Sequence, residues 1–133
     1  MEKNIFIIVA FATMIFASCK TQSIQTLTNQ TFTITELNGK PLKQIEETKP
    51  SISFSNDQVN ATVGCNSIFA TYKAYDNGNL TFDNGGATKM MCPDQMRENE
   101  FINAFNKVAH YVIKGKEIFF YDTNSILLFK GKK

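Results

Sequence analysis

The chain has 133 residues, a formal net charge of +2, three cysteines, one histidine and no tryptophan. This length suits one domain and excludes a large barrel enzyme, a doubly wound fold with a second domain and most solenoid arrays. The net charge of +2 is too small to suggest nucleic-acid binding by itself. A single histidine argues against most His-based metal sites and against a Ser-His-Asp triad. The hydrophobic share of 43% is ordinary for a globular protein, so wholesale disorder is not expected.

The N-terminal segment predicts a secretory signal peptide. A short polar start with one lysine precedes an apolar run over residues 5–17, which is shorter than the roughly 20 residues of a membrane-spanning helix. The run ends in Ala17-Ser18-Cys19, which resembles the lipobox of bacterial lipoproteins, with Phe16 where leucine is usual. The resemblance implies removal of residues 1–18 and lipidation of Cys19. Ordinary signal cleavage, with Cys19 as a bystander, is the alternative.

The residues after the cysteine bear on location. Lys20 stands where an aspartate would retain a lipoprotein at the inner membrane, so we expect a lipid-anchored protein of the cell envelope, at the outer membrane and facing the periplasm.

Residues 19–29 are polar, rich in Thr and Gln, and lack a helical or strand period, which is typical of a flexible tether. The folded domain is expected over residues 30–133.

Short alternating runs in this domain predict β-strands. They cover residues 31–35, 51–55, 59–63, 68–75, 80–83, 111–113, 118–121 and 126–129. Turn signals separate them, among them Asn38-Gly39 and Asn84-Gly85-Gly86, and we interpret the second as a break in the chain of strands. Regular short strands joined by tight turns indicate an antiparallel sandwich or barrel.

One segment has a helical period instead. Pro93-Asp94 opens it, and Phe101, Phe105 and Val108 recur at helical spacing, which predicts an amphipathic helix at about 94–107. A phenylalanine stripe of this kind could face a partner helix or a membrane. We expect it to cover the open apolar side of the sheet, because a small antiparallel sheet needs such a cover.

Two motifs in the predicted domain each contain a cysteine, Gly64-Cys65-Asn66 and residues 87–93. They resemble the signatures of the META domain, the family of HslJ-like lipoproteins, and the first resembles its Gly-Cys-Asn signature. Residues 87–93, with Thr88, Met90 and Cys92, resemble a second signature in which a threonine and a methionine precede a cysteine that opens the helix. The turn at residues 38–41 also matches, whereas Phe32 stands where many members have tryptophan. The resemblance covers about residues 31–129.

The resemblance implies a mainly β (α+β) fold, a small, partly open antiparallel β-barrel that is lipocalin-like, with the helix at about 94–107 packed against it. It implies no defined activity, only loose links to envelope stress and antibiotic tolerance. We therefore expect a monomeric, non-enzymatic envelope lipoprotein that binds an apolar small molecule or an envelope protein, with no catalytic residues, cofactor, metal or nucleic-acid partner. A thiol-redox protein or an accessory factor in periplasmic assembly or secretion is the alternative.

Cys65 and Cys92 are the only cysteines left once Cys19 is lipidated. An exported chain meets an oxidising compartment, so the two are expected to form a structural disulfide. A redox-active cysteine pair is the alternative with a chemical function, because a helix N-terminus lowers the pKa of a nearby thiol. No Cys-x-x-Cys motif supports this alternative. Two buried free thiols are the third possibility.

The remaining polar and apolar candidates favour structural roles. The amide of Asn66 could read a ligand, but such an asparagine more often bonds its own backbone in a turn. Glu98 and Glu100 are two residues apart on the expected helix and do not converge. The default for three methionines is core filling, with an adaptable apolar surface as the alternative. The default for three C-terminal lysines is a solvated basic tail, with weak contact to anionic lipid as the alternative. These residues are Met90, Met91 and Met96, and Lys130, Lys132 and Lys133.

Overall fold

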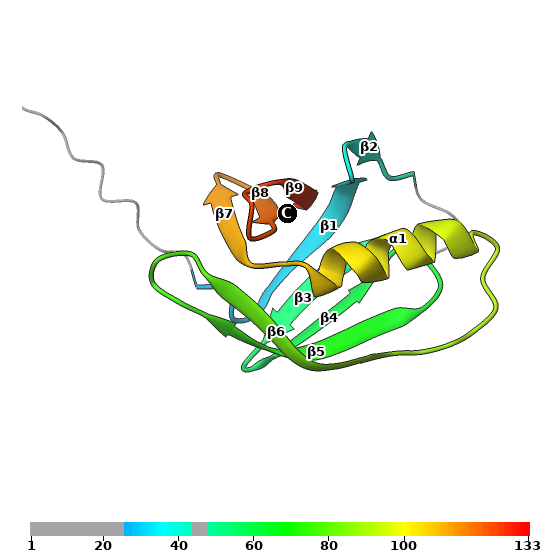
Figure 1. Cartoon of the computed structure of the whole chain (residues 1–133), viewed down its shortest axis with the longest axis horizontal. Helices are drawn as coiled ribbons and strands as arrows, with labels where there is room; N and C mark the ends of the chain where they lie inside the picture. The colour runs from blue at the N-terminus through cyan, green and yellow to red at the C-terminus, as the bar shows by residue number, and fades with distance from the viewer. Residues whose placement is uncertain (1–25, 44–47) are drawn as a thin grey trace, which may run out of the picture.

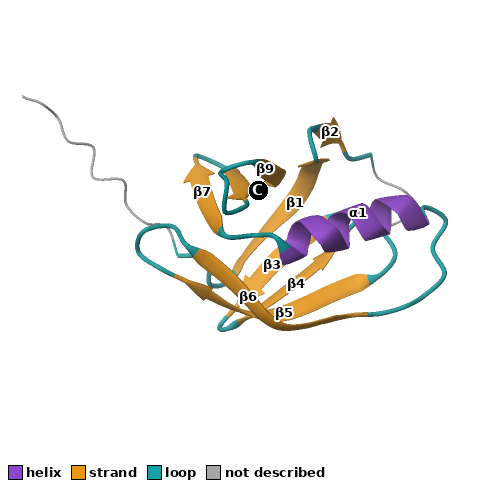
Figure 2. Ribbon diagram, in the orientation of Figure 1, coloured by secondary structure: helices purple, strands orange, loops and turns teal. Residues whose placement is uncertain are grey.

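The structure is a computed structural model that describes residues 26–43 and 48–133 (Figure 1). The expected signal peptide, Cys19 and most of the expected tether lie outside the described residues. Nine strands and one helix make up the described chain (Figure 2). They are β1 Gln30–Leu37, β2 Lys40–Pro41, β3 Ser51–Ser55, β4 Gln58–Thr62, β5 Ser67–Ala74, β6 Leu80–Ala87, α1 Gln95–Asn106, β7 His110–Lys114, β8 Glu117–Tyr121 and β9 Leu127–Lys132.

All these strands belong to one antiparallel sheet. Its order is β6-β5-β4-β3-β1-β9-β8-β7, and the short β2 pairs with β1 outside this path. Strands joined by tight turns are neighbours, as short connections require. The last strand returns to the first, so that Thr33 in β1 lies opposite Lys132 in β9. The two halves of the chain are thereby joined into one curled sheet (Figure 1).

The curled sheet closes at one end, where its two edge strands meet. The N–H of Leu80 donates to the carbonyl of Ala109 at 2.9 Å, and the N–H of Tyr111 donates to the carbonyl of Gly78 at 3.0 Å. From there β6 leads into the long loop before α1, and α1 lies across the open side of the sheet (Figure 2). This confirms the predicted partly open antiparallel barrel with one covering helix.

The helix begins and ends within one residue of its expected bounds. Asp94 is the N-cap, and its Oδ1 accepts a hydrogen bond from the N–H of Arg97 at 2.9 Å. The apolar side of α1 buries Phe101, Ala104 and Phe105. Within residues 26–43 and 48–133, no helix is long and apolar enough to cross a membrane.

Aromatic side chains fill the space between the sheet and α1. Phe105 stacks on Phe82 with ring centroids 4.4 Å apart, and Phe101 meets Phe129 edge-on at 5.2 Å. Phe129 in turn stacks on Phe120 at 4.5 Å. Such pairs each add about 0.5–1.5 kcal/mol to the stabilisation from burial alone. The helix therefore closes the open side of the barrel as part of a continuous aromatic core.

The glycines after Asn84 do not end their strand, so the predicted break was wrong. β6 runs through them to Ala87, with a register shift against β5 between Phe69 and Thr71. The ring of Phe69 covers Gly86 so closely that a Cβ added there would lie 2.8 Å from the ring carbon Cζ. The glycines form a β-bulge and leave room for the ring of Phe69 to pack against the strand. Local sequence composition alone does not distinguish such a bulge from a turn.

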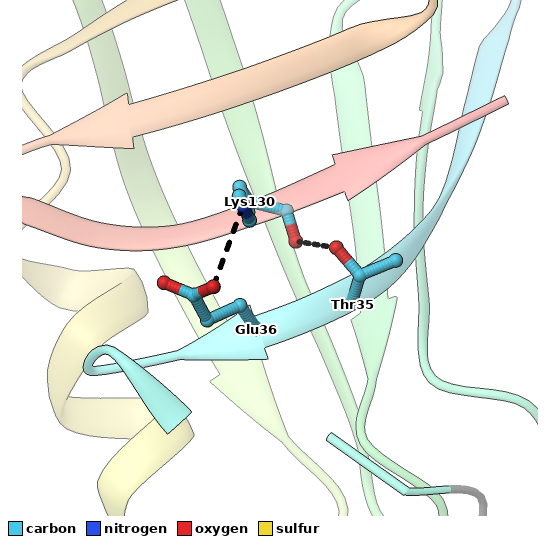
Figure 3. A network of polar contacts seen from close by, with 3 residues as sticks. All are labelled: Thr35, Glu36 and Lys130. Carbon is cyan, nitrogen blue, oxygen red and sulfur yellow. Dashed lines mark hydrogen bonds and ion pairs between the residues drawn. The ribbon is translucent and has the colours of Figure 1, made fainter. Parts of the chain in front are cut away.

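Two of the three C-terminal lysines, Lys130 and Lys132, belong to strand β9, so the expected solvated tail was wrong for them. The ammonium of Lys130 in β9 lies 3.4 Å from Oε2 of Glu36 in β1, and its carbonyl accepts a hydrogen bond from the hydroxyl of Thr35 at 3.4 Å (Figure 3). Both contacts sit at a bulge in β1 between Ile34 and Glu36. The ion pair is partly exposed and contributes at most about 1 kcal/mol, so its main effect is to fix the pairing of β1 with β9.

The packed domain begins before residue 30, where the sequence placed its boundary. Leu27 is 1% exposed and belongs to the core. The hydroxyl of Thr28 lies 3.3 Å from that of Tyr72 in β5. Ile24 and Leu27 stand in a polar stretch that lacks a strand or helical period, so the sequence pattern could not assign Leu27 to the core.

Candidate functional site

The two motifs meet at one corner of the fold. Residues 64–66 connect β4 to β5, and residues 88–92 lie in the loop from β6 to α1 (Figure 1). Cys65 and Cys92 are joined by a disulfide with Cα atoms 5.9 Å apart, so the expected pairing is present. We call the group that surrounds this bond the disulfide corner. It consists of Gly64, Cys65, Asn66, Thr88, Met90, Cys92 and Glu98.

Asn66 holds the corner together. It is 4% exposed. Its Oδ1 accepts hydrogen bonds from the N–H of Met90 at 2.8 Å and from the hydroxyl of Thr88 at 3.0 Å. Its Nδ2 donates to the carbonyl of Met90 at 3.3 Å and to Sγ of Cys92 at 3.0 Å. The amide bonds to a segment 22 to 26 residues away, so the expectation that it bonds its own local backbone was wrong.

Thr88 and Gly64 complete the backbone of the corner. The N–H of Thr88 donates to the carbonyl of Ser67 at 3.0 Å, and the N–H of Ser67 donates to the hydroxyl of Thr88 at 3.0 Å. The N–H of Gly64 donates to the hydroxyl of Thr62 at 3.1 Å. Gly64 has a φ of 135°, which side-chain-bearing residues rarely adopt, so this bend requires glycine.

Glu98 is a buried carboxylate beside the disulfide. It is 3% exposed, and its Oε1 accepts a hydrogen bond from the N–H of Cys65 at 3.1 Å. Its Oε2 is also buried and has no hydrogen-bond partner in the described part of the chain. This role of Glu98 was not predicted from the sequence. The available signal was spacing, because Glu98 precedes Phe101 by three residues and Phe105 by seven and so shares their inward side of the helix.

A small cavity lies between these groups. Its volume is about 10 Å³, and Gly64, Cys65, Arg97 and Glu98 are among its lining residues. Nε and Nη2 of Arg97 are buried and lack a partner within the described ranges. A cavity of this size has room for about one water molecule. The corner can therefore hold a water or a single ion among its charged groups, but no organic molecule.

The methionines near the corner face solvent, contrary to the expectation that they fill the core. Met90 is 57% exposed, Met91 99% and Met96 73%. The backbone N–H and carbonyl of Met90 both point at Asn66, which leaves its side chain on the outer side of the loop. We call these three side chains the methionine surface.

A second concavity, not predicted from the sequence, lies at the closed end of the barrel. It is open, has a volume of about 250 Å³, and includes Tyr72, Tyr75, Asp76 and Tyr111 in its lining. Burial raises the pKa of Tyr111 above its ordinary value, and the neighbouring Tyr72 and Asp76 raise this pKa further. The concavity thus offers aromatic faces and hydroxyl groups rather than an apolar chamber.

Solved structures show the fold of this chain, and a family model shows its family. The chain is similar to a protein solved by NMR (23% identity, TM-score 0.63, covering 80% of this chain and 91% of that one) and to a protein from Burkholderia xenovorans, also solved by NMR (16%, 0.62, 80% and 83%). It is also similar to a crystal structure of a DUF4847 family protein from Bacteroides vulgatus ATCC 8482 (14%, 0.59, 80% and 93%). At these identities the likeness shows the fold alone. No curated protein matches the chain. The META domain model matches residues 25–133, so the chain belongs to the META domain family.

Proposed function

We propose that this protein is a lipid-anchored, non-enzymatic, monomeric protein of the bacterial cell envelope that binds an envelope protein through the methionine surface. One observation carries the proposal: three large apolar side chains are exposed in a seven-residue segment that a disulfide ties to the sheet. Methionine is flexible and polarizable and suits adaptable binding surfaces. Clustered exposed apolar residues mark interaction sites more often than isolated ones do.

The packing of the barrel supports a partner at the surface rather than an apolar ligand inside. The rings of Phe105, Phe82, Phe101 and Phe129 occupy the space between α1 and the sheet. A ligand there would have to displace these side chains, of which Phe101, Phe105 and Phe129 are fully buried and would each cost several kcal/mol to lose from the core. The tyrosine-lined concavity supports a second candidate function, which is binding of an amphipathic small molecule.

The anchored location rests on the sequence. The apolar run over residues 5–17 and the Ala17-Ser18-Cys19 ending support lipidation at Cys19, and Lys20 favours the outer membrane. A role in envelope stress or antibiotic tolerance follows from the family resemblance. A thiol-redox function remains the alternative, supported by the hydrogen bond from Asn66 to Cys92 Sγ near the start of α1. An accessory role in assembly or secretion is compatible with the same partner-binding surface.

Site-specific photocrosslinking tests the partner surface. A photoreactive amino acid replaces Met91 in the full chain, expressed in its envelope, and replaces Tyr75 in a control, because Tyr75 is 49% exposed on the tyrosine-lined concavity. We expect one discrete crosslinked envelope protein from position 91, absent from position 75 and lost when Met90 and Met96 are changed to serine. Identical patterns from both positions, or no adduct from position 91, would exclude the methionine surface as the docking site.

Metabolic labelling with a clickable fatty acid tests the anchor separately. We expect label in the wild-type chain, and loss of label and of membrane association in Cys19→Ser. A mature chain that is unlabelled and begins at a residue other than Cys19 would replace the lipoprotein assignment with ordinary secretion.

A further inference from the structure

Three metal-binding side chains converge at the disulfide corner. Sγ of Cys65, Sγ of Cys92 and a carboxylate oxygen of Glu98 all lie within 4.8 Å of one another. The two sulfurs are bonded to each other in the structure, and thiolates rather than disulfide sulfurs are good metal ligands. We propose that the reduced form of this corner is a binding site for a thiophilic metal ion such as zinc. The disulfide and the metal site are then two alternative states of the same three residues.

Glu98 is the observation that points to a ligand. A carboxylate buried to 3% exposure is costly unless both of its oxygens are satisfied. Oε1 is satisfied by the N–H of Cys65, whereas Oε2 has no hydrogen-bond partner within residues 26–43 and 48–133. A metal ion bound at Oε2 would satisfy it. The bond at Oε1 would then orient the carboxylate, as outer hydrogen bonds do in known metal sites.

The backbone geometry allows the change of state. Two thiolates on a tetrahedral zinc ion, with bonds of about 2.3 Å, lie roughly 3.8 Å apart. The Cα atoms of Cys65 and Cys92 are 5.9 Å apart, so rotation of the side chains alone can separate the sulfurs by that amount. Asn66 holds residues 88–92 in place independently of the disulfide, through its bonds to Thr88 and Met90.

The surroundings suit a metal with thiolate ligands. The side-chain amide of Asn66 donates to Sγ of Cys92 at 3.0 Å and would stabilise negative charge on that sulfur. The guanidinium of Arg97 borders the same cavity and offsets part of the charge of two thiolates and a carboxylate. Sulfur ligands select zinc-like ions over magnesium or calcium. Three protein ligands would leave the fourth position of a tetrahedral zinc ion for water.

The change of state balances with a dithiol as reductant. The reductant transfers two electrons and two protons to the S–S bond, which gives two thiols, and becomes a disulfide itself. Zinc then replaces the two thiol protons, which are released to solvent, so binding is weaker at lower pH. The proposal does not depend on a partner at the methionine surface or on lipidation of Cys19.

Zinc titration of the full chain in detergent micelles tests the site. The protein is reduced with a phosphine or left oxidised, and zinc is titrated in competition with a chromophoric chelator. We expect one zinc ion per reduced chain and none per oxidised chain. Cobalt in place of zinc should give a sulfur-to-metal charge-transfer band that is lost in Cys65→Ser.

Two variants on the same helix separate a ligand from a general charge effect. Glu98→Gln should weaken zinc binding by roughly tenfold or more, whereas Glu100→Gln should leave it within about twofold, because only Glu98 lies at the corner. Circular dichroism shows whether the reduced chain and both variants keep the β spectrum. Equal zinc binding by reduced and oxidised chains, equal affinities of the two variants, or a reduced chain that is unfolded with and without zinc would each overturn the proposal.

Discussion

The side-chain amide of Asn66 lies 3.0 Å from Sγ of Cys92, so the two family motifs are joined by a hydrogen bond as well as by a covalent bond. The same amide holds the backbone of Met90 through both its N–H and its carbonyl. The loop between β6 and α1 is therefore fixed by one side chain from the opposite loop. Thr88 and Cys92 bond to Asn66 through their side chains, whereas Met90 contributes only its backbone N–H and carbonyl.

Replacement of Asn66 should destabilise the domain. Asn66→Ala removes four partly buried hydrogen bonds and leaves the N–H of Met90 without its acceptor, which should lower the free energy of unfolding by about 2–4 kcal/mol. Urea denaturation measures the loss. Asn60→Ala, at an exposed position in β4, serves as the matched control and should change stability by less than about 0.5 kcal/mol. Equal losses in the two variants would show that the amide does not hold the corner.

Removal of the disulfide should lower the free energy of unfolding by a comparable amount, because the unfolded chain gains conformational entropy. The bond joins residues 27 apart, and the chain-entropy model gives about 3.5 kcal/mol for a loop of this length. We expect the Cys65→Ser, Cys92→Ser double variant to show this loss in urea denaturation at neutral pH. Cys19→Ser, which leaves the bridge intact, should match the wild-type chain. A double variant as stable as wild type would mean that Asn66 alone fixes the loop.

The features that the sequence predicted well are those encoded locally. Alternation in residues 51–55 and the spacing of Phe101 and Phe105 report which side of an element is buried, and both survive in β3 and α1. The disulfide followed from a cysteine count and an expected compartment. These inferences need no knowledge of which distant segment packs against which.

The features that could not be predicted from the sequence depend on contacts between distant segments. Nothing near Asn66 shows that its acceptors lie 22 to 26 residues away, and the outward direction of Met90 follows from that contact. Asn84-Gly85-Gly86 has the composition of a turn, and only the opposing ring of Phe69 shows why glycine is needed in a strand. Glu98 is polar at an apolar position of the helix, which becomes meaningful once the N–H of Cys65 is seen to reach it.

Helix α1 stabilises the domain mainly through the burial of its phenylalanine side chains. Phe105→Ala would remove a ring that is 2% exposed and stacks on Phe82 at 4.4 Å, so we expect a loss of about 3–5 kcal/mol. Met96→Ala on the same helix removes a side chain that is 73% exposed and should be nearly neutral. Thermal unfolding followed by circular dichroism compares the two. If both variants unfold at the wild-type temperature, α1 does not share the core of the sheet.

Gly131 marks a close approach between the first and last strands. A Cβ added there would lie 2.8 Å from the carbonyl oxygen of Thr33 and 3.2 Å from Cβ of Phe32, and a backbone atom cannot move aside as a flexible side chain can. Gly131→Ala should therefore cost about 1–3 kcal/mol in urea denaturation. Lys132→Ala, one residue further along β9 and exposed, should have little effect. Similar stability of the two variants would mean that β9 and β1 can separate at this point without cost.

Stability should fall at alkaline pH because of Tyr111. Burial, Tyr72 and Asp76 raise the pKa of Tyr111 in the folded state, so the phenol is favoured there in its neutral form. In the unfolded chain the phenol ionises near its ordinary pKa of about 10. The unfolded state then binds fewer protons than the folded state, and the free energy of unfolding decreases as the pH rises from about 10 toward the raised pKa. Below about pH 10 the stabilisation from this group is fully present.

Two conservative variants isolate this contribution. Urea denaturation at a series of pH values should show a shallower alkaline decline for Tyr111→Phe than for the wild-type chain. Tyr75→Phe, which changes a tyrosine that is 49% exposed in the same concavity, should keep the wild-type decline. The comparison uses the slope against pH rather than stability at neutral pH, so loss of a contact made by the Tyr111 hydroxyl does not confuse it. Parallel declines in all three proteins would show that the ionisation of Tyr111 is not coupled to folding.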